Sequence, residues 1–208
     1  MTVLVIGLLL FLSMHSIRIV ADGWRSAQIA RLGEKPWKGI YTLVSLVGFG
    51  LIIWGYGLSR ASPVDLWNPP PWTRHLTVLL TIPAFILITA AYVPGNRIKA
   101  AVGHPMVLGV KVWAFAHLLS NGRLGDVLLF GAFLVWSALS FRAARGRDRA
   151  VAAQSGAAQT GGAAQGGAAA MPASPAGGVL KTVVIGLVIW VVFGWLLHGW
   201  LIGVNPFA

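Results

Sequence analysis

The chain has 208 residues, of which 57% are apolar and 10% are charged, whereas about a quarter of the residues of a typical soluble domain are charged. This composition excludes a water-soluble globular protein and leaves room for about half a dozen membrane spans of roughly 20 residues. The net charge of +11 comes from basic residues spread between apolar stretches. That pattern is typical of charges that orient a membrane protein, so we expect no nucleic-acid partner. The sequence contains no cysteine, which excludes disulfides, thiolate metal sites and covalently attached c-type haem.

Long apolar runs predict an all-α, polytopic membrane bundle of about six transmembrane helices. The fourth and fifth runs are short and lie close together, so they are expected to form a tight hairpin that is tilted or spans the bilayer imperfectly. The N-terminal run lacks preceding basic residues and a small-residue cleavage site, and we interpret it as a retained helix. The six predicted helices cover residues 2–21, 38–59, 74–93, 106–120, 126–141 and 180–203.

A change of composition separates the last predicted helix from the others. Residues 1–141 hold helices one to five of a membrane domain, and residues 180–208 hold the final helix of the same domain. Residues 142–179 are rich in Ala, Gly, Gln, Ser and Pro, which predicts a flexible cytoplasmic linker with no packing role. Its first arginines are interpreted as membrane-flanking charges, with a lipid-headgroup or partner site as the alternative. These arginines are Arg142, Arg145, Arg147 and Arg149.

The distribution of Lys and Arg predicts the orientation of the bundle. The loops after helices one, three and five hold eleven of the sixteen basic residues, whereas the loops of the opposite side hold three. Basic loops stay on the cytoplasmic side of a membrane. We therefore place the odd-numbered loops in the cytoplasm and both termini on the other side.

Ionisable residues in or beside the predicted spans are informative, because such groups are rare in membranes unless they are paired or functional. The predicted topology places His15 and His104 on the cytoplasmic side, whereas His75, His117 and His198 approach the other side. Two imidazoles that face one another from different helices suit a b-type haem, whose iron they would bind as axial ligands. No Asp or Glu lies deep in a predicted span, which argues against ion-coupled transport.

Three further residues are placed near these histidines by the helical repeat. Arg18 follows His15 by three residues and shares its helix face, where it would meet a haem propionate. Lys111 follows His104 by seven residues and lies about 10 Å deeper, at 1.5 Å per residue. We expect Lys111 and His117 to line the cavity or to support its ligands, with hydrogen bonds to backbone carbonyls as the structural alternative.

The remaining histidines and several glycines have plainer interpretations. His75 adjoins Arg74 at a span start and is assigned to the interface. The three histidines of the non-cytoplasmic side are an alternative metal site, but no carboxylate is spaced with them. Small residues in the second predicted helix allow close helix packing or make room for a flat ring. They are Gly48, Gly50, Gly55 and Gly57.

Taken with their neighbours, these residues resemble the NnrU family of bacterial membrane proteins along nearly the whole chain, apart from the Ala/Gly-rich segment. One difference is Gly199, which follows the final histidine where the family is expected to have proline. The matching pieces are His15-Ser16-Ile17-Arg18, Lys38-Gly39-Ile40-Tyr41, Gly103-His104-Pro105-Met106, Trp113-Ala114 with Ala116-His117-Leu118-Leu119, Leu129-Phe130-Gly131 and Leu197-His198-Gly199-Trp200.

The resemblance implies a multi-pass protein of the bacterial inner membrane that is linked to denitrification, in the metabolism of nitrite and nitric oxide. With the predicted orientation, both termini would be periplasmic. The family is also similar to the plastid zeta-carotene isomerase, a membrane enzyme that uses haem b to isomerise a cis double bond. Its haem-ligand histidines fall on the positions of His15 and His104.

Three functions follow from these observations. The first is a haem-b membrane protein that senses or processes nitric oxide or supports membrane reductases. The second is a haem-dependent isomerase that acts on a polyene or another lipid-phase substrate. The third is a permease or assembly factor without a cofactor, in which the histidines line a polar path. In each case the protein contacts membrane lipid, and the haem content of His15 and His104 variants separates the first two functions from the third.

Overall fold

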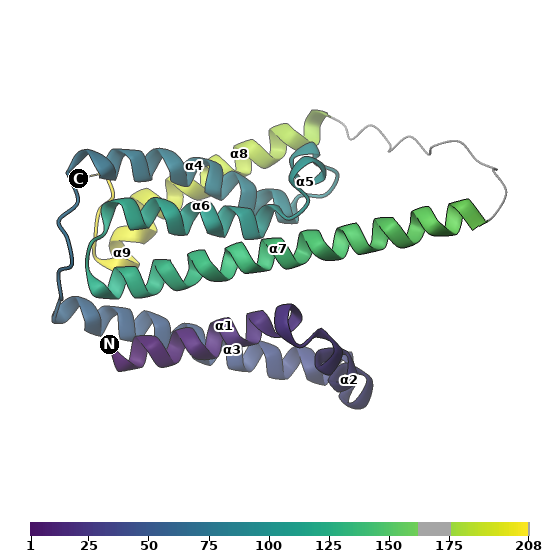
Figure 1. Ribbon diagram of the computed structural model, residues 1–208. Helices are drawn as coiled ribbons and strands as arrows, with labels where there is room; N and C mark the ends of the chain where they lie inside the picture. The colour runs from purple at the N-terminus through teal and green to yellow at the C-terminus, as the bar shows by residue number, and fades with distance from the viewer. Residues whose placement is uncertain (162–175, 208) are drawn as a thin grey trace.

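The computed structural model describes residues 1–161 and 176–207, and it is an all-α bundle (Figure 1). Five helices in the described residues are long and apolar enough to cross a membrane, and a shorter apolar helix, α6, accompanies them. The predicted all-α membrane bundle is therefore confirmed. Its main helices are α1 (Thr2–Val20), α3 (Glu34–Ala61), α4 (Trp72–Tyr92), α6 (Pro105–Ser120), α7 (Leu124–Gly161) and α8 (Ala176–Val192), which continues through a π-helical turn, η1 (Phe193–Leu197), into α9 (His198–Ile202).

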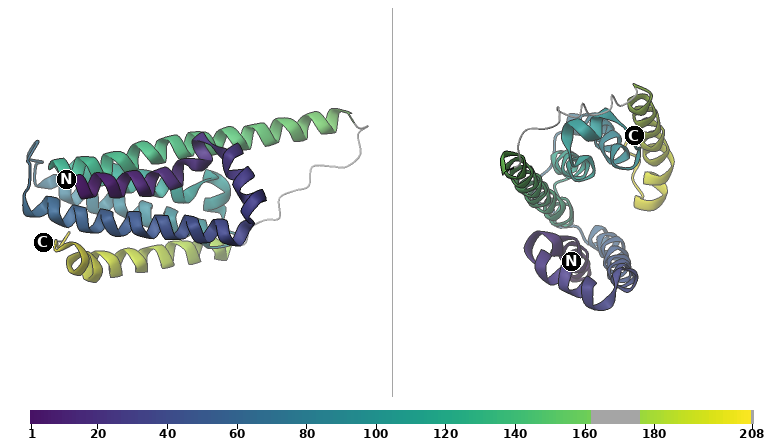
Figure 2. Two further views of the ribbon diagram at one scale, coloured as in Figure 1. Left: turned by 90° about the horizontal axis from the view of Figure 1, so that it is seen from below. Right: turned by 90° about the vertical axis from the view of Figure 1, so that its right-hand side faces the viewer.

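The two ends of the bundle differ in what they carry. The short helices α2 (Asp22–Leu32) and α5 (Arg97–Val102) lie at one end with the C-terminal part of α7, which we call the basic end (Figure 1). Both chain termini lie at the opposite end, which we call the terminal end (Figure 2). The described helix ends that flank the loops rich in Lys and Arg thus lie at one end, as the positions of the basic residues predicted. Reading for long apolar runs missed α2 and α5 because both helices are short and polar.

α1 and α3 approach each other through glycines. A methyl group added to Gly7 would lie 2.6 Å from the backbone nitrogen of Ile52, and one added to Gly48 would lie 2.8 Å from that of Phe11. Such close contact between backbones is a common way for helices to associate in lipid. The predicted packing role is confirmed for Gly48 and also for Gly55, whereas Gly50 and Gly57 face open space.

The other helices are joined by apolar contacts and by a few hydrogen bonds. Leu4, Leu8, Ile52, Leu129 and Phe130 form a buried cluster that joins α1 and α3 to α7. Hydroxyl groups of α4 bridge to its neighbours, because the Thr77 Oγ1 lies 2.7 Å from the carbonyl oxygen of Ala116 in α6 and the Thr81 Oγ1 accepts from Trp190 of α8 at 3.0 Å. Interhelical hydrogen bonds of this kind contribute to association where lipid removes the hydrophobic driving force.

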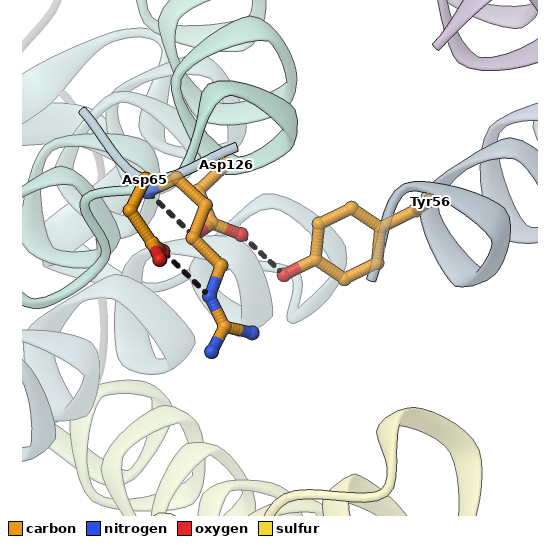
Figure 3. Close-up of polar contacts among 4 residues, drawn as sticks. Tyr56, Asp65 and Asp126 are labelled. Atoms are coloured by element: carbon orange, nitrogen blue, oxygen red, sulfur yellow. Dashed lines mark hydrogen bonds and ion pairs between the residues drawn. The ribbon is translucent and has the colours of Figure 1, made fainter. Parts of the chain in front are cut away.

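A polar cluster joins α3 to the start of α7 at the terminal end (Figure 3). The Tyr56 hydroxyl donates to Asp126 Oδ1 at 2.7 Å, and the backbone N–H of Arg123 donates to Asp126 Oδ2 at 3.2 Å. The Arg123 side chain pairs in turn with Asp65 at 3.3 Å. Asp126 is only 4% exposed. It therefore caps α7 and anchors α3 at once, and we call these four residues the terminal-end cluster.

The flexible linker was predicted to begin at residue 142, which is too early. α7 continues without a break to Gly161, so the first part of the segment predicted to be flexible is helical, and Ala144 in it is buried. Ala and Arg are strong helix formers, and here they outweigh the glycines that suggested a coil. Residues 162–175 of the predicted linker lie outside the described residues, and the last four belong to α8.

Candidate functional site

A pocket of about 730 Å³ lies between α1, α6 and α7 near the basic end, within the usual size range of ligand sites. Its lining brings together both histidines predicted as ligands, His15 and His104, with Arg18. We call it the histidine pocket. Its apolar wall includes Ile19 of α1 and Val107 of α6.

His15 lies in the last turns of α1, with its ring stacked on Phe11 at 4.1 Å between centroids. Its Nδ1 is 2.7 Å from the carbonyl oxygen of Phe11. Because a carbonyl only accepts hydrogen bonds, Nδ1 carries the proton and Nε2 keeps a lone pair. That tautomer is the form in which an imidazole binds a metal through Nε2.

His104 occupies the N-cap of α6, directly before Pro105 in the first turn. The preceding Gly103 has a positive φ of 74°, which only glycine adopts readily, and it turns the chain from α5 into α6. The Nε2 of His104 lies 2.9 Å from Asp148 Oδ2. The imidazole is 30% exposed and the carboxylate 47% exposed. Binding of a metal at Nε2 would replace Asp148, whereas Nδ1 has no hydrogen-bond partner within the described part of the chain.

Two guanidinium groups line the same pocket. Arg18 comes from α1, and Arg147 comes from the part of α7 that was predicted to be a linker. An Arg147 Nη1 lies 3.5 Å from the carbonyl oxygen of Arg18, so the two chain segments meet here. Arginine pairs well with carboxylates because its planar fork donates two parallel hydrogen bonds. From the sequence Arg147 was interpreted as a membrane-flanking charge, and Asp148 was not singled out. The helical repeat would have placed both beside the site had α7 been predicted to continue.

Two residues that line the pocket have a buried polar atom without a partner in the described part of the chain. Within the described residues, three buried side-chain polar atoms have no hydrogen-bond partner, namely Ser45 Oγ, Trp136 Nε1 and Ser140 Oγ. Two of the three belong to residues that line the histidine pocket. Buried polar groups are seldom left unpaired, because each costs about 1–3 kcal/mol.

The donor set of the pocket fits haem b. Imidazoles from two helices provide two axial ligands for an iron whose other ligands come from the macrocycle, and the two arginines match propionate carboxylates. A bare metal ion is a poorer match, because the described residues contain no group of three or more His, Cys, Asp or Glu side chains that is suited to hold one.

Lys111 and His117 lie elsewhere on α6 and are not among the residues that line the histidine pocket. The Nδ1 of His117 is 2.9 Å from the carbonyl oxygen of Trp113, and its ring stacks on Phe130 at 4.6 Å. These contacts match the structural alternative stated for a buried histidine. A supporting role for Lys111 or His117 stays a prediction.

The other two histidines are at or near the terminal end. His75 is exposed in the first turn of α4, as expected of an interfacial residue. His198 Nδ1 is 2.7 Å from the carbonyl oxygen of Val204. Neither residue joins a group of potential metal ligands in the described part of the chain.

Comparison with known proteins adds one finding to this geometry. The family described as NnrU protein matches residues 3–206, which include every residue of the histidine pocket. No curated protein and no solved structure matches the chain. The match covers nearly the whole sequence, and the chain belongs to the NnrU family.

Proposed function

We propose that this chain binds one haem b in the histidine pocket and uses it in the nitrogen-oxide metabolism of denitrification, for redox chemistry, sensing or the support of membrane reductases. The observation that carries this proposal is the convergence of His15 and His104, from different helices, in one pocket with Arg18 and Arg147. The link to denitrification rests on the family resemblance alone.

Different residues of the histidine pocket would bind different parts of haem b. His15 would offer its Nε2 lone pair, and His104 would offer its free Nδ1 while Asp148 of α7 holds its Nε2. Arg18 and Arg147 would bind the propionates. When bound, haem would supply reversible one-electron transfer and an iron that takes small ligands.

The same proposal places the protein in the bacterial inner membrane, with its basic end in the cytoplasm and both termini in the periplasm. Its support is the concentration of Lys and Arg in the odd-numbered connections, since basic loops are retained on the cytoplasmic side. A protease added to intact spheroplasts should cleave a tag at either terminus, and cleavage only after lysis would reverse the orientation.

The experiment that tests haem binding is a visible absorption spectrum of the full chain, purified in detergent after expression with ample haem. Sharp α and Soret bands after reduction with dithionite, at one haem per chain, are expected. A spectrum without features in the visible region would overturn the proposal and favour the permease or assembly factor.

A second candidate function, isomerisation of a polyene or another lipid-phase substrate at the same haem, is favoured by a neighbouring groove. The groove has a volume of about 420 Å³ and lies between α1 and α7, with Leu9, Leu12, Leu128 and Ala132 in its mostly apolar lining. Such a surface matches a hydrocarbon chain that arrives from the bilayer. Conversion of a cis polyene by the haem-loaded protein, followed by chromatography, would support this function, and recovery of the unchanged cis isomer would exclude it for that substrate.

A further inference from the structure

We propose that the groove between α1 and α7 binds a membrane quinol, which donates electrons to a haem in the adjacent histidine pocket. This inference rests on the proposed haem function and names the electron donor of that site. The reduction of nitrogen oxides consumes electrons, so a haem that takes part in it needs a donor. A donor that dissolves in the bilayer reaches a groove on the lipid-facing surface directly.

The groove fits a long apolar chain that carries a polar end. Its volume is about 420 Å³, and Val5, Leu9 and Leu128 line its apolar part. Leu9 is 63% exposed, so this part is open to the bilayer. Ser13 and Ser16 belong to the same lining and lie in the second half of α1, toward the basic end. An isoprenoid quinol has this form, because a ring with two hydroxyl groups ends a long hydrocarbon tail.

The polar side chains of the groove are Ser13 and Ser16, and neither makes a hydrogen bond within the described part of the chain. Serine and threonine in a helix often bond a carbonyl oxygen of the preceding turn. Ser137 of α7 does so at 2.9 Å, and Thr182 of α8 does so at 2.8 Å. Ser13 is exposed and Ser16 is half-buried, so both side chains are accessible to a ligand in the groove.

Hydroxyl groups match both redox forms of the proposed ligand. A serine donates a hydrogen bond to a carbonyl oxygen of the quinone and accepts one from a hydroxyl group of the quinol. A lysine would only donate, and a carboxylate would only accept. Ser13 and Ser16 are three residues apart, so they lie on one face of α1, about 4.5 Å apart along its axis. A polyene hydrocarbon, by contrast, has no group that pairs with either serine.

The groove and the histidine pocket lie on neighbouring faces of α1. Ser16 of the groove directly follows His15 of the pocket. A helix with its side chains is about 10–12 Å across, a distance that electrons cross by tunnelling, so the transfer needs no free position on the iron. Oxidation of one quinol to the quinone breaks its two O–H bonds and releases two electrons and two protons. The electrons reduce two ferric haems to the ferrous form, and the protons pass to water at the basic end.

The test uses decylubiquinol, a quinol with a short alkyl tail, and the full chain loaded with oxidised haem in detergent without oxygen. Reduction of the haem is followed by its α band after rapid mixing. We expect a rate that saturates with quinol concentration, and one quinol consumed for every two haems reduced. Ser13→Ala and Ser16→Ala should each raise the half-saturating concentration about fivefold, the usual effect of one neutral hydrogen bond.

The apolar part of the groove is tested by a third variant. Ala132→Leu adds bulk where the tail would lie, and it should also raise the half-saturating concentration. Ser26→Ala is the matched control for the two serine variants, because Ser26 is exposed on α2 and does not line the groove. It should behave as wild type. Reduction by dithionite should be equal in all variants, because this reductant needs no binding site.

The position of the ligand is tested without use of the haem. An azidoquinone is irradiated with the full chain, and the labelled residues are located by mass spectrometry. We expect labels on the segments of α1 and α7 that line the groove, and excess decylubiquinone should prevent them. Labels confined to other helices would overturn the proposed site.

The outcomes distinguish this inference from the function on which it rests. Wild-type protein without haem would overturn both. Haem that dithionite reduces but the quinol does not would overturn the quinol site alone. So would a rate that rises linearly with quinol concentration, or kinetics that Ser13→Ala, Ser16→Ala and Ala132→Leu all leave unchanged, because the reaction would then not depend on the groove.

Discussion

The terminal-end cluster and the histidine pocket are both polar, but they differ in how completely their groups are paired. In the cluster, both oxygens of the buried Asp126 accept hydrogen bonds, from Tyr56 and from the backbone of Arg123. In the pocket, Trp136 Nε1 and Ser140 Oγ have no partner in the described part of the chain. Unpaired polar groups are costly in a bilayer. The cluster is therefore a structural joint, whereas the helices that form the pocket contain polar groups that the described part of the chain leaves unpaired.

One helix carries both regions. α7 begins with Asp126 in its first turn, presents Trp136 and Ser140 further along, and reaches Arg147 in the part that was predicted to be a linker. Substitutions near the start of this helix should accordingly change the stability of the protein, and substitutions further along should change the binding or the properties of the proposed haem.

The largest expected effect is the loss of haem on removal of a proposed axial ligand. His15→Ala and His104→Ala should each lower the haem content per chain by about tenfold or more, because one imidazole holds the iron much less firmly than two. The haem content is measured as the pyridine haemochrome of purified protein.

The matched control for these variants is His75→Ala, at an exposed histidine of α4. It should keep the wild-type haem content. Normal haem content in both His15→Ala and His104→Ala would rule out ligation of the iron by this pair. The histidine pocket would then not be a haem site.

The next largest effect is expected at Asp126, in the terminal-end cluster. Asp126→Ala removes the cap of α7 and leaves the Tyr56 hydroxyl buried without an acceptor, which should lower the free energy of unfolding by about 3 kcal/mol. Unfolding is followed by circular dichroism in detergent. Asp65→Ala is the control, because that carboxylate is 74% exposed and its ion pair contributes at most about 1 kcal/mol. Equal stability of the two variants would refute a structural role for Asp126.

A smaller loss of stability is expected where α1 meets α3. Gly48→Ala places a methyl group 2.8 Å from the backbone nitrogen of Phe11, so the helices must separate, at a cost of about 1–3 kcal/mol. Gly50→Ala adds the same methyl group where nothing lies within 4 Å. It should be as stable as wild type in the same unfolding experiment. If both variants lose stability to the same extent, the close approach of the two helices is not what the first substitution disturbs.

The smallest effect is expected at Asp148, which orients His104. Asp148→Asn removes a negative charge beside a proposed iron ligand but keeps a hydrogen-bonding group, so haem should remain bound. The midpoint potential should rise, on the order of tens of millivolts, because the oxidised iron loses a stabilising charge. A redox titration of wild type and variant measures the shift, and an unchanged or lower potential would show that Asp148 does not act on the haem.

Much of the helical framework could be predicted from the sequence, because the spacing of apolar runs reports directly on membrane spans. The bounds of α1, α4 and α6 agree with the predicted ranges to within two residues. The extension of α7 was missed because its Ala- and Gly-rich composition lacks the apolar signal on which such reading depends. The place of Arg147 and Asp148 beside the site was missed with it.

Only part of the site could be predicted from the sequence. Counting charges placed His15 and His104 on one side of the membrane, and the structure brings them to one pocket with Arg18. The contact between Tyr56 and Asp126 joins residues that are 70 positions apart, and no local sequence pattern predicts it. The unpaired donors of Trp136 and Ser140 are likewise a property of packing, because only the folded chain shows which polar groups lack a partner.

Electron paramagnetic resonance of the oxidised, purified protein at low temperature tests the proposed ligation of haem by His15 and His104 most directly. We predict a low-spin ferric haem with two imidazole ligands in wild type, and loss of that signal in His15→Ala and in His104→Ala. Absence of a haem signal in wild type, or a low-spin signal that both substitutions leave unchanged, would contradict it.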